Sequence, residues 1–210
     1  MTRRLPRACS SVLAVLLIAA CTVTTSDPGD DDQRAVERFR EQNAVQYDLT
    51  APRTAQELGV EPGRDSAIFD RDSSEYWDVT FQLPGGTTFR TGGAIAVAVI
   101  VSDEPDALVN SVGINVQAQD DDELAELLQR DVAQLGLQPA DVQEVLREVQ
   151  QQPLSLQGSG FTRGLTGGTF GYLSTYVEVR TSLDDDRIAV NYDFNWDPAG
   201  AAPAPAPSVG

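Results

Sequence analysis

The chain has one long stretch with the periodicity of an α-helix, and it is interrupted once. Apolar residues recur every three or four positions over 123–135 and again over 139–151, which places each set on one helix face. The stripe of the first helix consists of Leu124, Leu127, Leu128, Val132 and Leu135. Acidic residues at 120–123 suit a helix N-terminus, Gly136 suits a helix end, and Pro139 suits the first turn of a second helix. The sequence therefore predicts an αα-hairpin.

On both sides of this pair, apolar residues alternate with polar ones, as they do in half-buried β-strands. Residues 77–83 alternate up to a Pro-Gly-Gly turn, 94–101 are apolar on both faces as in a central strand, and 112–116 alternate again. Two further runs, 169–182 and 187–196, follow the helical pair. This order predicts an α+β fold: an antiparallel sheet of about five to six strands with the αα-hairpin packed on one face.

The last two runs also predict a register. Leu173 and Val177 occupy odd positions in the first run, whereas Tyr192 and Trp196 occupy even positions in the second. Because directly paired residues share a face of the sheet, an odd position must pair with an even one. We expect Val177 opposite Tyr192 and Leu173 opposite Trp196, with Phe194 and Trp196 pointing inward and 183–186 forming the loop. The other face would then carry Tyr172, Tyr176, Glu178, Arg180, Asn191, Asp193 and Asn195.

Composition excludes several kinds of catalysis. The 15 basic residues are all arginine, there is no histidine, and the two cysteines are Cys9 and Cys21. Serine nucleophiles activated by histidine or lysine, zinc sites of cysteine and histidine, and lysine Schiff bases therefore lack their essential groups. Carboxylates remain, as paired acids or as oxygen ligands of Ca²⁺ or Mg²⁺. We expect no catalytic residues and no cofactor, and the net charge of −17 disfavours nucleic acid as a partner and favours basic proteins.

The N-terminus carries the features of an export signal. Three arginines precede the apolar run Val12–Ala20, which is well short of the ~18 residues needed to span a bilayer. Ile18-Ala19-Ala20-Cys21 resembles the lipobox of bacterial lipoproteins. The resemblance implies a signal peptide at 1–20, acylation (palmitate and related chains) of Cys21, and a mature protein anchored at the outer face of the cell membrane. The composition, in which every basic residue is arginine and acidic residues predominate, and the Ala-Pro tail are similar to those of actinobacterial envelope lipoproteins. An ordinary cleaved signal with a chance cysteine is the alternative.

The rest of the chain divides into three parts. Residues 21–33, which begin with the acylated cysteine, are predicted to form a flexible acidic tether. A single α+β domain is expected over 34–196, beginning with a short helix at 34–43. Residues 197–210 alternate alanine and proline and are predicted to be extended or disordered.

Two predicted loop segments are candidate sites. Adjacent carboxylates attract a divalent cation, which makes the predicted hairpin tip a weak metal candidate, namely Asp184, Asp185 and Asp186. Known calcium loops space their ligands at alternate positions, so plain surface charge is the alternative. The glycine-rich segment 158–171 is predicted to be a mobile connection, with a ligand or partner loop as the alternative.

The predicted outer face of the last hairpin is the candidate interaction surface, because aromatics beside amides and carboxylates are typical of recognition surfaces. Its members are Tyr172, Tyr176, Glu178, Asn191, Asp193 and Asn195. The alternative is a plain solvated sheet face, or one partly covered by the 34–43 helix.

Three functions remain open. The first is a non-catalytic, lipid-anchored envelope lipoprotein that binds another protein. The second is a carrier or sensor of an apolar or lipid-like ligand, and the third is a carboxylate-based hydrolase. A filled core favours the first, a large apolar cavity the second, and a cleft with facing acids the third.

Overall fold

The computed structural model describes the larger part of the predicted domain: residues 42–60, 66–70, 75–101, 108–151, 161–181 and 187–196. The predicted signal peptide with Cys21, the tether and the Ala-Pro tail lie outside the described residues. So do the aspartates at 184–186 and all but the last two residues of the predicted helix at 34–43.

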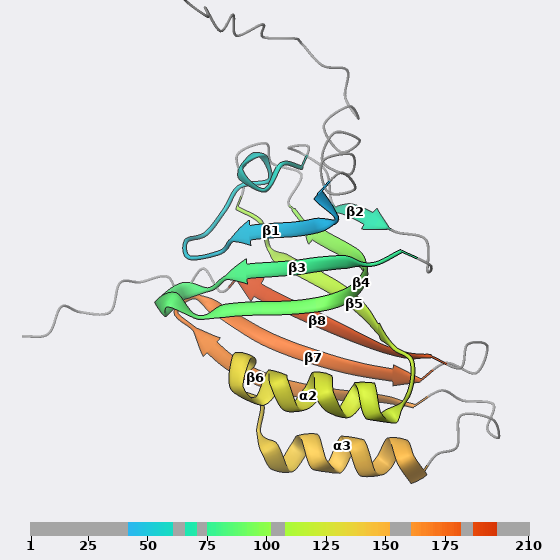
Figure 1. The fold of residues 1–210 in the computed structure, drawn as a ribbon. Helices are drawn as coiled ribbons and strands as arrows, with labels where there is room; N and C mark the ends of the chain where they lie inside the picture. The colour runs from blue at the N-terminus through green and yellow to red at the C-terminus, as the bar shows by residue number, and fades with distance from the viewer. Residues whose placement is uncertain are drawn as a thin grey trace, which may run out of the picture.

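The described residues form one eight-stranded sheet and two α-helices (Figure 1). In chain order the elements are β1 (Ala44–Asp48), η1 (Gln56–Leu58), β2 (Ser66–Asp70), β3 (Trp77–Gln82), η2 (Pro84–Gly86), β4 (Thr88–Ile100), β5 (Ser111–Ala118), α2 (Asp121–Leu135), α3 (Pro139–Gln151), β6 (Thr162–Phe170), β7 (Leu173–Thr181) and β8 (Ile188–Trp196). The sheet order is β1-β3-β4-β5-β8-β7-β6, and β2 pairs with β4.

The predicted α+β class is confirmed, but the predicted sheet is wrong in two respects. It has eight strands rather than five or six, because β1, β2 and β6 were not predicted. It is also mixed, because β1 pairs with β3 in parallel. Parallel neighbours need a crossover of a dozen or more residues, and the segment between β1 and β3 is long enough to provide it.

A bend in β4 folds the sheet over itself. The first part of β4 pairs with β3, its second part pairs with β5 and β2, and Gly93 between them has a φ of +73°. Phe89 at the start of β4 therefore packs on Phe194 and Tyr192 of β8, with ring centroids 5.2 Å apart in both pairs, although β8 is not its neighbour in the sheet. Large side chains fill the interior between the two halves of the sheet; those less than 2% exposed include Trp77, Tyr192, Phe69, Phe81, Phe89 and Phe194.

Both predicted helices are confirmed, and they lie on the same side of the sheet (Figure 1). The side chain of Asp120 accepts a hydrogen bond from the Glu123 N–H at 2.9 Å, which caps α2 as the acidic run predicted. The predicted stripe of α2 needs one correction. Asp131 is fully buried, whereas Val132 beside it is only half-buried. Neither helix within the described ranges is long and apolar enough to cross a membrane.

The prediction of a mobile connection at 158–171 is wrong for residues 162–170, which form the edge strand β6. Glycines of this strand allow α2 to pack closely against it. A Cβ on Gly167 would lie 2.1 Å from Thr175 Oγ1 and 3.1 Å from the Leu135 carbonyl oxygen, and one on Gly168 would lie 3.2 Å from the same oxygen. The end of α2 can therefore approach β6 only because these positions lack side chains.

The predicted register of the last hairpin is confirmed. Val177 of β7 pairs with Tyr192 of β8, and Leu173 pairs with Trp196. Phe194 is fully buried as expected, whereas Trp196 at the strand end is only half-buried. The loop predicted at 183–186 lies outside the described residues.

Candidate functional site

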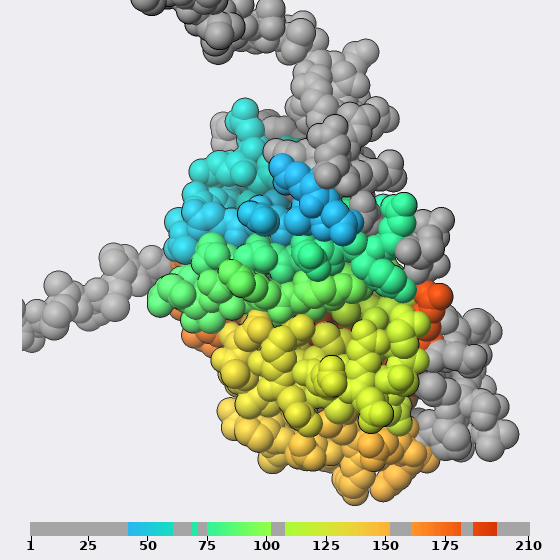
Figure 2. All heavy atoms as spheres, in the orientation of Figure 1, coloured from blue at the N-terminus to red at the C-terminus, as the bar shows by residue number. Residues whose placement is uncertain are grey.

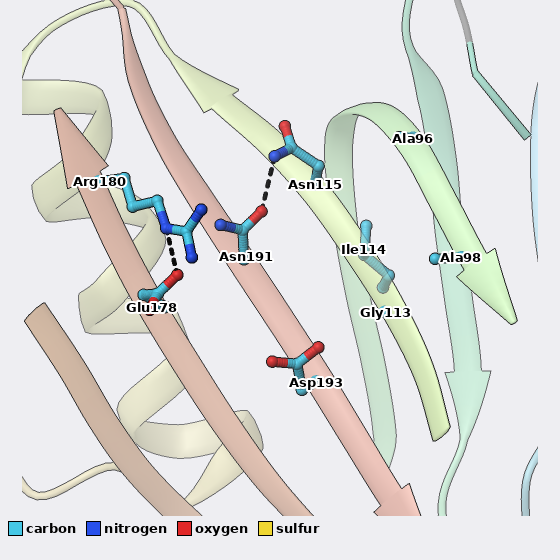
Figure 3. Close-up of a pocket in the computed structure, with 9 residues that line it drawn as sticks. All are labelled: Ala96, Ala98, Gly113, Ile114, Asn115, Glu178, Arg180, Asn191 and Asp193. Carbon is cyan, nitrogen blue, oxygen red and sulfur yellow. Dashed lines mark hydrogen bonds and ion pairs between the residues drawn. The ribbon is translucent and has the colours of Figure 1, made fainter. Parts of the chain in front are cut away.

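A hollow of about 300 Å³ lies on the face of the sheet that points away from the helices (Figure 3). Alternation in β7 and β8 directs Val177 and Tyr192 into the core, so that Glu178, Asn191 and Asp193 point the opposite way. We call this hollow the outer trough; it is lined by Ala96, Ala98, Gly113, Ile114, Asn115, Glu178, Arg180, Asn191 and Asp193.

Two rows of residues paired across neighbouring strands begin at alanines of β4, and the small side chains at this end leave the space of the trough. One row runs Ala98–Gly113–Asp193, and the next runs Ala96–Asn115–Asn191–Glu178. A Cβ on Gly113 would lie 3.3 Å from Asp193 Oδ1 and 3.8 Å from the Ala98 Cβ. A larger residue at position 113 would thus fill the floor of the trough beside Asp193.

The two carboxylates of the trough differ in their partners. Glu178 forms an ion pair with Arg180, two residues along the same strand. Asp193 forms no ion pair or hydrogen bond with any other described residue. Burial raises the pKa of Asp193, the negative charge of Glu178 raises it further, and the Arg180 guanidinium opposes both. The trough therefore holds one carboxylate without a counter-charge of its own.

The amides of the trough add a second unmet acceptor. Asn115 Nδ2 donates to Asn191 Oδ1 at 2.6 Å, which links β5 to β8. The Oδ1 atom of Asn115 is buried and has no hydrogen-bond partner among the described residues. Because Asn115 Oδ1 is enclosed, the Asp193 carboxylate is the acceptor that a ligand with N–H donors could reach.

Three of the six predicted surface residues line the trough: Glu178, Asn191 and Asp193. Tyr176 lies on the same face and is 37% exposed, but its ring leans over the backbone of β6, since a Cβ on Gly164 would lie 1.7 Å from its hydroxyl oxygen. Asn195 is exposed at the end of β8 and pairs with Ser111 and Ser174, outside the lining of the trough.

The prediction that Tyr172 is exposed is wrong. It lies in the turn before β7 rather than in the strand, after Gly171 with a φ of +60°, so the alternation of β7 does not extend to it. Its hydroxyl donates to the Leu49 carbonyl oxygen at 2.6 Å, and burial raises the pKa of Tyr172 to about 12. Tyr172 therefore ties the loop after β1 to the final hairpin.

Sequence reasoning missed four residues that shape the trough: Ala96, Ala98, Gly113 and Asn115. A signal was present, because Gly113 and Asn115 are the polar-face positions of a strand that was predicted correctly. Pairing that strand with β8 would have placed them beside Asn191 and Asp193.

A second polar cluster, also missed, lies on the opposite side of the sheet. Tyr192 donates to Asp131 Oδ2 at 2.7 Å, and Arg130 donates to Asp131 Oδ1 through Nε at 3.2 Å and Nη2 at 3.1 Å. Nη2 of Arg130 also donates to Thr91 Oγ1 at 3.2 Å. Burial raises the pKa of Asp131, an effect that Arg130 and Tyr192 oppose. This core network ties α2 to β8 and β4.

The described residues contain no group of three or more histidine, cysteine, aspartate or glutamate side chains placed to hold a metal ion. The metal candidates Asp184, Asp185 and Asp186 lie outside these residues.

No family model, curated protein or solved structure matches this chain.

Proposed function

We propose that the protein is a non-catalytic interaction module that receives a basic side chain of a partner protein in the outer trough. The carboxylate of Asp193, which is half-buried and has no counter-charge of its own, is the observation that carries this proposal. A guanidinium or ammonium group would supply the positive charge and the N–H donors that the Asp193 carboxylate lacks.

The size and shape of the trough fit a side chain better than a larger ligand. It is an open hollow of about 300 Å³ with a floor of two alanines and a glycine. An arginine or lysine stem can lie on such a floor while its charged head reaches the carboxylates. The chain's 32 acidic residues against 15 basic ones would also attract a basic partner over a longer range.

The carrier and hydrolase hypotheses receive less support. A carrier of an apolar ligand requires an apolar cavity, and large aromatic side chains fill the interior between the halves of the sheet. A carboxylate hydrolase requires two acids free to exchange protons with substrate and water, whereas Glu178 is held by Arg180.

Anchoring is part of the same proposal. The lipobox resemblance at Ile18–Cys21 supports a mature protein held at the outer face of the membrane by acylated Cys21, with the domain displayed to envelope or secreted partners. We expect Cys21→Ala to leave an unlipidated precursor. Mass spectrometry that found the same unacylated mature form for the wild type and the variant would contradict the anchor.

Binding can be tested on the folded domain with acetyl-arginine amide as the probe and acetyl-citrulline amide, its uncharged analogue, as the control ligand. We expect saturable changes in the amide NMR signals of Gly113, Asn115 and Asn191 with the arginine probe only. Asp193→Asn should abolish them, whereas Asp141→Asn, the same change on an exposed position of α3, should not. Equal responses to both probes, or in both variants, would contradict the proposal.

A further inference from the structure

The side of the molecule that carries the helices has a second hollow, which the proposed function does not use. It has a volume of about 540 Å³ and lies where α2 meets the first part of β4, with β3 and β1 beyond it. Figure 2 shows the side chains of α2, β3, β4 and β1 together on this face. We call it the α2 cleft; it is lined by Gln46, Asp78, Val79, Thr80, Arg90, Thr91, Gly92, Arg130 and Gln134.

The lining of the cleft is richer in arginine than the chain as a whole. Its lining contains two arginines, Arg90 and Arg130, and one carboxylate, that of Asp78. The whole chain has 32 acidic residues against 15 basic ones. Arg90 is exposed, and its guanidinium forms no ion pair with any other described residue. Arg130 is paired with Asp131, so Arg90 supplies the guanidinium of the cleft that has no ion-pair partner among the described residues.

The core network holds one of these arginines in a fixed orientation. Nε and Nη2 of Arg130 are occupied by Asp131 and Thr91, as described above, and its side chain is 32% exposed. Because the guanidinium is planar, fixing two of its nitrogens fixes the third, so the Nη1 donors are oriented before any ligand arrives. Preorganised donors lose little entropy when they bind.

A neighbouring residue of α2 contributes another donor. Gln134 Oε1 accepts a hydrogen bond from the backbone N–H of Arg90 at 2.8 Å, at the part of β4 that β5 does not pair with. This bond commits the oxygen of the Gln134 amide and leaves its NH₂ group as a donor. The lining of the cleft therefore includes three side chains with N–H donors, Arg90, Arg130 and Gln134, and the Asp78 carboxylate lies beside Gly92.

We infer that the α2 cleft binds a small oxyanion, a carboxylate or phosphate group, through Arg90, Arg130 and Gln134. Guanidinium groups pair with such oxyanions through paired, charge-assisted hydrogen bonds. Since the overall negative charge of the protein repels anions at long range, binding would depend on these short-range bonds. The inference is independent of the outer trough, which lies on the other side of the molecule and is proposed to bind a cationic group.

The test is an NMR titration of the folded domain with succinate and, separately, with inorganic phosphate at constant ionic strength. We expect saturable shifts at the Gly92 amide and the Gln134 side-chain amide. Arg90→Gln should weaken binding at least about 10-fold, because it removes charge-assisted hydrogen bonds without touching the core network. Arg147→Gln, the same change on an exposed position of α3, should leave binding unchanged.

Two additions make the outcome decisive. Arg130→Lys keeps the charge but loses the planar fork, and we expect it to weaken binding even if the fold is retained. Short-chain phosphatidylglycerol below its micelle concentration distinguishes a lipid headgroup from free phosphate as the source of the oxyanion; a response to either supports the site. Shifts that grow linearly without saturation, or that are the same in the Arg90→Gln and Arg147→Gln variants, would overturn the inference.

Discussion

Asp131 and Asp193 lie on opposite sides of the sheet, and in both of them burial is the largest cause of a raised pKa. Asp131 is fully enclosed, and both of its oxygens accept hydrogen bonds, from Tyr192 and Arg130. Asp193 is half-buried and accepts none from the described residues. A raised pKa therefore does not distinguish a structural carboxylate from a binding one. The hydrogen bonds that the carboxylate already makes do distinguish them.

The largest expected effect concerns stability. Asp131→Ala removes the common partner of Arg130 and Tyr192, and we expect it to lower the free energy of unfolding by about 2–4 kcal/mol. Asp193→Ala removes a carboxylate with no partner to lose, and should change stability by no more than about 0.5 kcal/mol. Urea denaturation of both variants measures the difference. Equal losses would show that the two carboxylates have the same role.

Two glycines extend the comparison. Gly167→Ala on the core side would place a Cβ against Thr175 Oγ1 and the Leu135 carbonyl oxygen, and we expect a loss of about 1–3 kcal/mol. Gly113→Ala in the trough would place a Cβ 3.3 Å from the movable end of the Asp193 side chain, and at an ordinary contact distance of 3.8 Å from the Ala98 Cβ and the Tyr192 carbonyl oxygen. It should keep the wild-type stability and weaken binding of acetyl-arginine amide. Thermal denaturation and the NMR titration together check both results; a destabilised Gly113→Ala variant would mean that the trough is tightly packed.

A smaller effect is expected in the pH dependence of stability. Because the pKa of Asp131 is raised above 3.8 in the folded state, the unfolded chain ionises first as pH rises. The folded state then loses stability relative to a variant that cannot ionise. The free energy of unfolding of the wild type, relative to that of Asp131→Asn, should therefore be highest below about pH 4 and should decline as pH rises through the pKa of Asp131 in the folded state. An advantage that grows with pH would mean that Arg130 outweighs burial.

The parts predicted correctly from the sequence are those in which local pattern and burial agree. The α2 and α3 helices carry apolar residues at helical spacing, α2 begins after the capping residue Asp120, and the β7–β8 register follows from parity alone. The errors arise where a distant contact decides. The glycines of β6 resemble a loop because their packing partner, the end of α2, is remote in sequence. Position 131 lies on the same helix face as Leu124 and Leu128, but the apolar pattern assigns Val132 to the buried stripe instead. The burial of Asp131 depends on its hydrogen bond with Tyr192, which lies 61 residues further along the chain.

The candidate surface was predicted in part for the same reason. Parity places Glu178, Asn191 and Asp193 on the outer face, and they line the trough. It says nothing of the neighbouring strand, so the floor at Gly113 was missed, and it does not apply to Tyr172, which precedes the strand.

The most direct test of the account is the pKa of Asp193, followed by the ¹³C signal of its carboxyl group with and without acetyl-arginine amide. A guanidinium bound beside Asp193 would stabilise the ionised form. We expect the ligand to lower the pKa of Asp193 and leave that of Asp131 unchanged. An unchanged pKa of Asp193 in the presence of saturating ligand would contradict the claim that the outer trough receives a basic side chain.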